Sequence, residues 1–293
     1  MIVITPTAGL CNRMRALDSA LALARAAGVP AKAIWRLNSD LNCRFEELFE
    51  PVPGLEALES LDDSRTSLPE DLGRLREASK RFKPAVLLVK AARKAIRAVR
   101  NSSSRSRVIR RPEIKRLRGR PEELVRLAGK YDLYIETYDR FFLGEEDYRG
   151  FRPVESIRNE VRALGSDLGT AVGVHIRRTD HDYQDHSPTE LFIAAMKAAS
   201  RGDPGLRFFL ASDSPEVEKQ LEAEFPGRIV RQRNKAYTRN SPEGIRHAMI
   251  DLYCLASCAR IIGSYASSFS ETAAELGRIP CEIMDSGPSQ HTS

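Results

Sequence analysis

The sequence predicts an α/β protein whose C-terminal half folds as a doubly wound parallel sheet. Five short apolar segments in this half have the length and composition of buried strands, and four segments between them have helical spacing. Proline stands at or near most of the predicted helix starts, where its missing N–H costs nothing. This alternation is typical of parallel sheets, which bind ligands at the carboxyl ends of their strands. The predicted strands are 171–177, 207–212, 228–231, 260–264 and 281–284, and the predicted helices begin near Pro188, Pro215, Pro242 and Ser268.

The N-terminal half has a less regular pattern. Residues 2–5 predict a strand, and residues 12–27 predict a helix with apolar side chains three and four positions apart, ended by Gly28 and Pro30. Residues 38–120 predict only short helices, loops and one longer basic helix. The remaining predicted elements are a strand at 33–36, a helix at 121–129 and a strand at 131–137.

Length and composition predict two domains. A chain of 293 residues with 42% hydrophobic residues can bury two cores, and we expect domains 1–150 and 151–293. No apolar run reaches the roughly 18 residues of a membrane helix, and the initial apolar segment stops at Pro6. The five cysteines are scattered, which predicts reduced thiols. We therefore expect a soluble cytoplasmic protein.

The net charge of +6 comes from one block. Residues Lys90 to Arg120 hold thirteen Lys or Arg against a single acid, Glu113. The block predicts half an amphipathic helix and half a Ser/Arg-rich loop, which can simply be solvated. The functional alternatives are an acidic glycan acceptor or peripheral contact with anionic lipid at the inner face of a membrane. No nucleic-acid partner is expected, because zinc fingers and interleaved aromatic residues are lacking.

The segment GVHIRRTD, residues 173–180, predicts an anion site. An apolar strand that ends in Arg177 and Arg178 directs two rigid, permanently charged donors to one point, which suits a phosphate or diphosphate. The alternative is a surface network in which both arginines pair with Asp180 and other carboxylates.

Two further strand ends fall on the same predicted edge. FFLASDSPE ends a strand at Ser212 and Asp213, and IIGSYASSFS leads into a helix that starts near Ser267 or Ser268. Ordinary helix capping is the alternative for each. Free amides and serine hydroxyls at a helix start can also bind anions. Together the three strand ends predict a diphosphate clamp, and a sugar nucleotide is its natural ligand.

These motifs resemble those of a known superfamily. The run YTRNSPEGIRHAMIDLYCLASCARIIGSYASSFS, residues 237–270, is similar to a segment of α1,6-fucosyltransferases, and GVHIRRTD and FFLASD resemble two other motifs of that family. GLCNRMRAL resembles the glycine-asparagine loop of bacterial relatives. The resemblance spans about residues 171–277 and points to the superfamily that includes nodulation and protein O-fucosyltransferases. Residues 38–150 show none.

The resemblance implies a GT-B-like fold of two Rossmann-like domains, with GDP-fucose bound in the C-terminal domain and no metal. The N-terminal domain would face the acceptor. By the same resemblance, Arg177 would hold the β-phosphate with support from Arg178, and Ser267 with Ser268 would cap the phosphate. His175 and Asp251 would bind guanine. Asp213 would order the nearby loops, and Asp180 would belong to the donor site.

The chain departs from the family just after the arginine motif. His181 stands where the family has a lysine, and the general base has two candidates, Asp182 and Asp185. The cluster could alternatively hold a metal, although its spacing fits no zinc pattern and the adjacent arginines repel a cation. That cluster is His175, His181, Asp182, Asp185 and His186.

The leading functional hypothesis is a glycosyltransferase that moves fucose from GDP-fucose to a hydroxyl of a glycan or lipid-linked saccharide, with inversion and without metal. One alternative is the same fold with another nucleotide sugar. A second is a non-catalytic protein that binds anions through Lys90 to Arg120. In the N-terminal half, Asn12 and Arg13 are the candidates for an acceptor or interdomain loop, with helix capping and a solvated charge as their respective alternatives.

Overall fold

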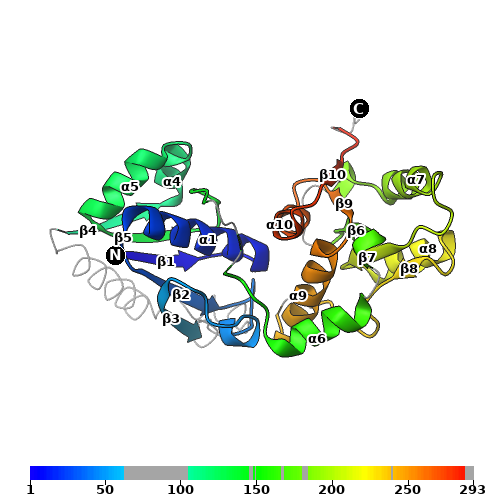
Figure 1. Cartoon of the computed structure of the whole chain (residues 1–293), viewed down its shortest axis with the longest axis horizontal. Coiled ribbons are helices and arrows are strands. Elements are labelled where there is room, and N and C mark those ends of the chain that lie inside the picture. Colours follow the sequence, from blue (N-terminus) through cyan, green and yellow to red (C-terminus); the bar gives the residue numbers. More distant parts are fainter. Residues whose placement is uncertain are drawn as a thin grey trace, which may run out of the picture. The chain divides into compact units, whose positions relative to one another are not determined.

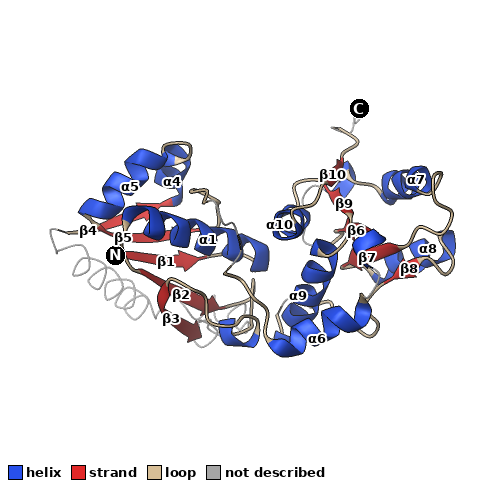
Figure 2. Ribbon diagram, viewed as in Figure 1, coloured by secondary structure: helices blue, strands red, loops and turns tan. Residues whose placement is uncertain are grey.

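The computed structural model describes residues 1–62, 105–144, 148, 150–165, 168–179, 184–238 and 240–287. The chain forms two compact units, each an α/β structure built on a five-stranded parallel sheet (Figure 1 and Figure 2). The first unit comprises Met1–Leu41 and Pro53–Glu146, and the second comprises Asn42–Val52 and Asp147–Ser293. The predicted α/β class with two parallel sheets is thereby confirmed.

The sheet of the first unit has the strand order β3-β2-β1-β5-β4. Its central strand is buried along its whole length and pairs in parallel with a neighbour on each side. The first helix of the unit packs against it and ends at Gly28, whose φ of 61° is the left-handed conformation that glycine adopts without strain. The elements are β1 (Ile2–Pro6), α1 (Leu10–Ala27), β2 (Ala31–Leu37), β3 (Leu55–Asp62), β4 (Ser106–Arg110), α4 (Arg111–Leu117), α5 (Pro121–Lys130) and β5 (Asp132–Thr137).

Two strands of this sheet contradict the expectation for residues 38–120. β3 is rich in helix-forming Leu, Glu and Ala, but its pairing with β2 overrides that propensity. β4 occupies part of the predicted Ser/Arg-rich loop and pairs with β5. Only Ile109 of β4 is buried, so the strand carries almost no periodic signal. The predicted loop is therefore wrong for residues 106–117, and the basic helix expected before residue 100 lies outside the described residues.

Arg13 is fully buried at the carboxyl edge of the first sheet. Its Nε donates to the carbonyl of Ala8 at 2.7 Å, Nη2 donates to Asn38 Oδ1 at 2.8 Å, and Nη1 donates to the carbonyl of Arg36. The guanidinium also lies 5.1 Å from the ring centroid of Trp35. Arg13 thus joins the loop after β1 to the end of β2, and the alternative of a solvated surface charge is wrong.

We expect Arg13→Met to destabilise the first unit by about 2 kcal/mol, because buried oxygens lose their donors. Trp35, the single tryptophan, reports directly on this environment. The measurement is the urea midpoint followed by tryptophan fluorescence. Arg25→Met is the matched control, since Arg25 is exposed on the same helix. Equal midpoints for the two variants would contradict a structural role for Arg13.

The segment Asn42–Val52 leaves the first unit between β2 and β3 and packs with the second. It contains the short 3-10 helix η1 (Phe45–Glu47). Phe49 packs edge-on against Phe151 with 5.4 Å between ring centroids, and Glu50 accepts from Arg158 at 2.5 Å. The chain therefore crosses between its units on each side of this segment as well as near residue 146.

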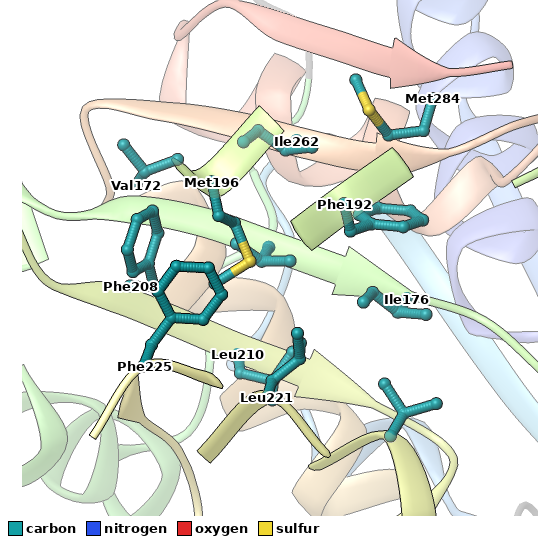
Figure 3. Packing of buried hydrophobic residues seen from close by; sticks show 12 residues of the cluster. Val172, Ile176, Phe192, Met196, Phe208, Leu210, Leu221, Phe225, Ile262 and Met284 are labelled. Carbon is teal, nitrogen blue, oxygen red and sulfur yellow. The ribbon is translucent and has the colours of Figure 1, made fainter. Parts of the chain in front are cut away.

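The sheet of the second unit has the order β10-β9-β6-β7-β8, the doubly wound arrangement predicted from the sequence. Side chains of β6 alternate between its two faces. Val172, Val174 and Ile176 join one core with α7 and α8, shown in Figure 3. The elements are α6 (Glu155–Leu164), η4 (Leu168–Thr170), β6 (Val172–Ile176), η5 (Gln184–His186), α7 (Thr189–Ala199), β7 (Phe208–Ser212), α8 (Pro215–Glu224), β8 (Ile229–Val230), α9 (Pro242–Ala256), β9 (Arg260–Ser264), α10 (Ser268–Gly277) and β10 (Cys281–Met284).

The opposite face of β6 packs against α9 and α10. A Cβ on Gly173 would lie 2.9 Å from Leu255 of α9, and a Cβ on Gly263 of β9 would lie 2.5 Å from Ser270 of α10. These two glycines permit the close approach of the helices. Gly173, His175 and Arg177 share this face by strand alternation.

The strand order reverses at β6, which pairs with β7 on one side and β9 on the other. In open α/β sheets, ligands bind beyond the carboxyl ends of the strands at such a point. None of the helices in the described ranges is both long enough and apolar enough to cross a bilayer.

Candidate functional site

The carboxyl ends of β6 and β9 are joined by one serine. Ser264 Oγ accepts from the backbone N–H of Arg177 at 3.0 Å and donates to the carbonyl of His175 at 3.2 Å. The bond fixes the backbone from which the Arg177 side chain projects. The loop after β6 therefore begins from a defined position.

Arg177 carries a donor that the described residues do not use. Its Nε is buried and has no hydrogen-bond partner among them. A buried unsatisfied donor costs about 1–3 kcal/mol unless a ligand or water supplies the acceptor. This guanidinium is thus positioned at the switch point with capacity for an anion.

Arg178 and Asp213 hold the loop that carries Arg177. Asp213 accepts from the backbone N–H groups of Arg178 and Thr179 at 2.7 and 3.1 Å and from Thr179 Oγ1 at 2.6 Å. Arg178 donates to the carbonyl of Arg177 and to Thr189 Oγ1, and its half-buried position lowers the pKa of its guanidinium. Asp213 therefore ties the end of β7 to the loop after β6.

Ser267 occupies the N-cap position of α10 without acting as a side-chain cap. The corresponding serines Ser214 and Ser241 accept from backbone N–H groups of α8 and α9 in the ordinary way. Ser267 Oγ is buried and has no hydrogen-bond partner among the described residues. The first backbone hydrogen bond of α10 runs from Glu271 N to the carbonyl of Ser267. The backbone N–H groups before Glu271 therefore have no acceptor within the helix. Hydroxyl groups and free amides at a helix start are groups that can bind an anion, and the role expected for Ser267 stays a prediction.

His175 is fixed on the α10 side of β6. Its Nδ1 lies 2.7 Å from Ser270 Oγ, and its ring stacks on Phe269 at 4.8 Å between centroids. The side chain is 7% exposed. The ring therefore has one defined orientation beside the start of α10.

Asp251 of α9 belongs to a buried ionic cluster. Its Oδ1 accepts from Gln232 Nε2 at 2.5 Å and its Oδ2 pairs with Lys235 Nζ at 3.2 Å. Lys235 also pairs with Glu218 at 2.8 Å. Burial raises the pKa of Asp251, and Lys235 and Gln232 offset part of that rise. The guanine-binding role expected for Asp251 stays a prediction.

The other predicted residues have varied positions. Asp180, His181 and Asp182 lie outside the described residues. Asp185 is exposed in η5, and Ser268 is the first residue of α10. Asn12 lies in the first turn of α1, whose N-cap is Gly9, so Asn12 is not the cap.

The described members of the alternative metal cluster lie in separate surroundings. His175 contacts Ser270, while His186 contacts Asp285. In the parts of the chain that the structure covers, no three His, Cys, Asp or Glu side chains are grouped as metal ligands.

Several side chains of the site were not predicted. Ser264 and Ser270 lie in the serine-rich run that signalled the helix start, but their partners on β6 could not be read from it. Lys235, Gln232 and Glu218 surround Asp251 from a loop and a helix without a motif.

Comparison with solved structures defines the class of fold. The chain is a two-domain α/β protein with a GT-B-like, fucosyltransferase-like fold. A crystal structure of NodZ α-1,6-fucosyltransferase soaked with GDP-fucose is 21% identical, covers 94% of this chain and 92% of its own, and gives a TM-score of 0.58.

Two other solved structures have the same fold. A FUT1 variant from Arabidopsis thaliana in complex with GDP is 14% identical, with a TM-score of 0.56 over 96% of this chain and 69% of that one. POFUT1 in complex with GDP-fucose is 12% identical, with a TM-score of 0.52 over 97% of each chain. No family model and no curated protein matches the sequence.

Proposed function

We propose that this protein is a glycosyltransferase that moves fucose from GDP-fucose to a hydroxyl of a glycan or lipid-linked saccharide, with inversion at the anomeric carbon. The observation that carries the proposal is a pair of buried polar atoms, Arg177 Nε and Ser267 Oγ, which have no hydrogen-bond partner among the described residues. They lie just after the ends of the neighbouring strands β6 and β9. Solved structures of the same fold contain GDP or GDP-fucose.

The chemistry fits these groups. Transfer from a nucleotide sugar leaves negative charge on the departing diphosphate, so fixed donors aimed at that charge lower the barrier. Arg177 would bind the β-phosphate, and Ser267 with the free amides of α10 would bind the phosphate from the helix side. Arg178 and Asp213 would hold the loop in place. The positive charge thus comes from side chains, and the proposal requires no metal ion.

The base of the nucleotide would lie toward His175 and Asp251. An ionised carboxylate accepts two hydrogen bonds from the N–H groups of a guanine edge, whereas uracil and thymine present only one N–H there. Burial raises the pKa of Asp251, and Lys235 and Gln232 act in the opposite direction, toward the ionised form. In this role Asp251 would favour a guanine nucleotide over a pyrimidine one.

A thermal-shift panel of GDP-, UDP- and TDP-sugars tests the proposal on the whole chain. At a ligand concentration of 100 times Kd, GDP-fucose would stabilise the second unit by about 2.7 kcal/mol, or roughly 5–10 °C in Tm. GDP alone would give a similar shift, because most contacts involve the diphosphate and base. A preference for a UDP- or TDP-sugar would contradict the guanine contacts, and no shift with any of them would contradict nucleotide-sugar binding.

A further inference from the structure

His186 and Asp285 form a hydrogen-bonded pair at the carboxyl edge of the second sheet. His186 ends η5, and Asp285 directly follows β10. The distance from His186 Nδ1 to Asp285 Oδ1 is 3.0 Å, and the side chains are 26% and 39% exposed. The two residues are 99 positions apart, so only the fold brings them together.

The position of the ring is fixed from several sides. It stacks on Tyr265 with 4.7 Å between centroids and 12° between planes, and the His186 carbonyl accepts from Ser286 N at 2.8 Å. Ser187 Oγ donates to the carbonyl of Met284 at 2.6 Å and accepts from Tyr265 N at 2.8 Å. These bonds join the end of η5 to the ends of β9 and β10.

The His186 and Asp285 pair is linked through Tyr265 to the residues proposed to bind the diphosphate. Tyr265 directly follows Ser264, whose hydroxyl holds the backbone of Arg177, and lies two residues before Ser267. The imidazole is therefore attached to the same strand end that supplies the phosphate-binding groups.

The pair has the chemistry of a positioned base. The hydrogen bond from His186 and the backbone N–H of Gly287 lower the pKa of the Asp285 carboxyl, so it is ionised at neutral pH. An ionised carboxylate can only accept, so Nδ1 is the donor in this hydrogen bond, and in an uncharged imidazole with that tautomer the lone pair is on Nε2. A carboxylate that fixes the tautomer and orientation of an imidazole in this way is the pattern of histidine general bases.

We infer that His186 is the catalytic base of the transfer and that Asp285 is its positioning residue, an inference that rests on the proposed function. The proton of the acceptor hydroxyl moves to His186 Nε2 while the acceptor oxygen bonds to the anomeric carbon. The bond from that carbon to the phosphate oxygen breaks, and its electron pair leaves on the diphosphate. His186 thereby takes the role expected of Asp182 or Asp185.

The test measures GDP release from GDP-fucose by the full chain, with water and then with azide as nucleophile. Water must lose a proton and azide has none to lose. His186→Gln would therefore slow the reaction with water about 100-fold and leave the azide reaction within about 2-fold of the unaltered chain. The titratable side chains in contact with the ring are Asp285 and Tyr265.

Asp285→Asn tests the positioning role of Asp285, and Asp203→Asn is its matched control. Each aspartate accepts from the backbone N–H two residues later, Gly287 at 2.8 Å and Gly205 at 2.9 Å, but Asp203 lies before β7, at the other end of the sheet. Asp285→Asn would slow the water reaction and spare the azide reaction, and Asp203→Asn would change neither. Equal loss of both reactions in His186→Gln would make His186 a donor-binding residue and overturn the inference. Normal activity of that variant, or a 100-fold loss in Asp185→Asn instead, would overturn it too.

A second measurement separates this inference from the proposed function. In the NMR spectrum, the His186 Cε1–H signal, identified by its absence in His186→Gln, would shift when GDP is added. If GDP raises Tm but does not move this signal, the base assignment fails and the proposed function stands. If neither GDP nor GDP-fucose raises Tm, both fail.

Discussion

Arg177→Ala would abolish both the thermal shift by GDP and the turnover of GDP-fucose. The Arg177 guanidinium is the donor proposed for the diphosphate, and its Nε has no hydrogen-bond partner among the described residues. Loss of one donor that stabilises transition-state charge typically costs 10²–10³ in kcat, and loss of a charge-assisted bond adds about 1.5–3 kcal/mol in binding. The measurements are Tm with GDP and the rate of GDP release.

Two variants make this result specific. Arg177→Lys keeps the charge but loses the planar fork, so we expect weak nucleotide binding and a residual rate. Arg260→Ala is the matched control, because Arg260 lies at the amino end of β9 and its ion pair with Glu282, at 3.2 Å, is partly exposed to solvent. Unchanged GDP binding in Arg177→Ala would overturn the assignment of the diphosphate site.

Lys235→Met would destabilise the second unit by about 3–5 kcal/mol. The Lys235 side chain is 3% exposed and lies between two buried carboxyl groups, Glu218 and Asp251. Removal of the cation takes away the partner that these groups share, and leaves Glu218 with Arg231 at 3.1 Å and Asp251 with the uncharged Gln232 at 2.5 Å. The loss of a buried charge costs far more than the loss of a surface pair. Hydrogen exchange of the α9 amides measures the effect in the unit concerned.

The same variant would show a defined pH dependence. The pKa of Asp251 is already raised by burial, and the loss of Lys235 raises it further. A carboxyl whose pKa is higher in the folded state than in the unfolded state loses its contribution to stability as pH rises through the folded value. The deficit of Lys235→Met would therefore be smaller near about pH 5 than near about pH 8. Lys197→Met is the surface control, where the pair with Glu224 is largely exposed and a change of about 0–1 kcal/mol is expected. A pH-independent deficit would contradict this electrostatic explanation.

The regular half of the fold could be predicted because its signals are local. Apolar strands alternate with helices that begin at or just after Pro188, Pro215 and Pro242, and the structure has α7, α8 and α9 at these places. The candidate site at the end of β6 could be located for the same reason, since a strand that ends in two arginines is visible in eight residues, and its role stays a prediction. By contrast, β3 and β4 owe their conformation to pairing with β2 and β5, which the sequence does not encode locally.

The side-chain partners of the site could not be predicted because they come from distant residues. Nothing near Arg13 indicates that the ends of β1 and β2 will surround it. Nothing in the serine run distinguishes Ser267, whose hydroxyl has no partner in the part of the chain that the structure describes, from Ser264, whose hydroxyl joins two strands. His186 and Asp285 become a pair only when β10 takes its place beside β9.

The segment Asn42–Val52, which packs with the second unit, affects how the chain folds during synthesis on the ribosome. This segment emerges about one hundred residues before Phe151 and Arg158, the side chains that cover Phe49 and pair with Glu50. Until they arrive, Phe45, Leu48 and Phe49, which are buried in the finished protein, remain uncovered. The nascent N-terminal unit therefore displays an apolar loop that a holding chaperone can bind, and the two units cannot be produced as independent fragments by one cut near residue 146.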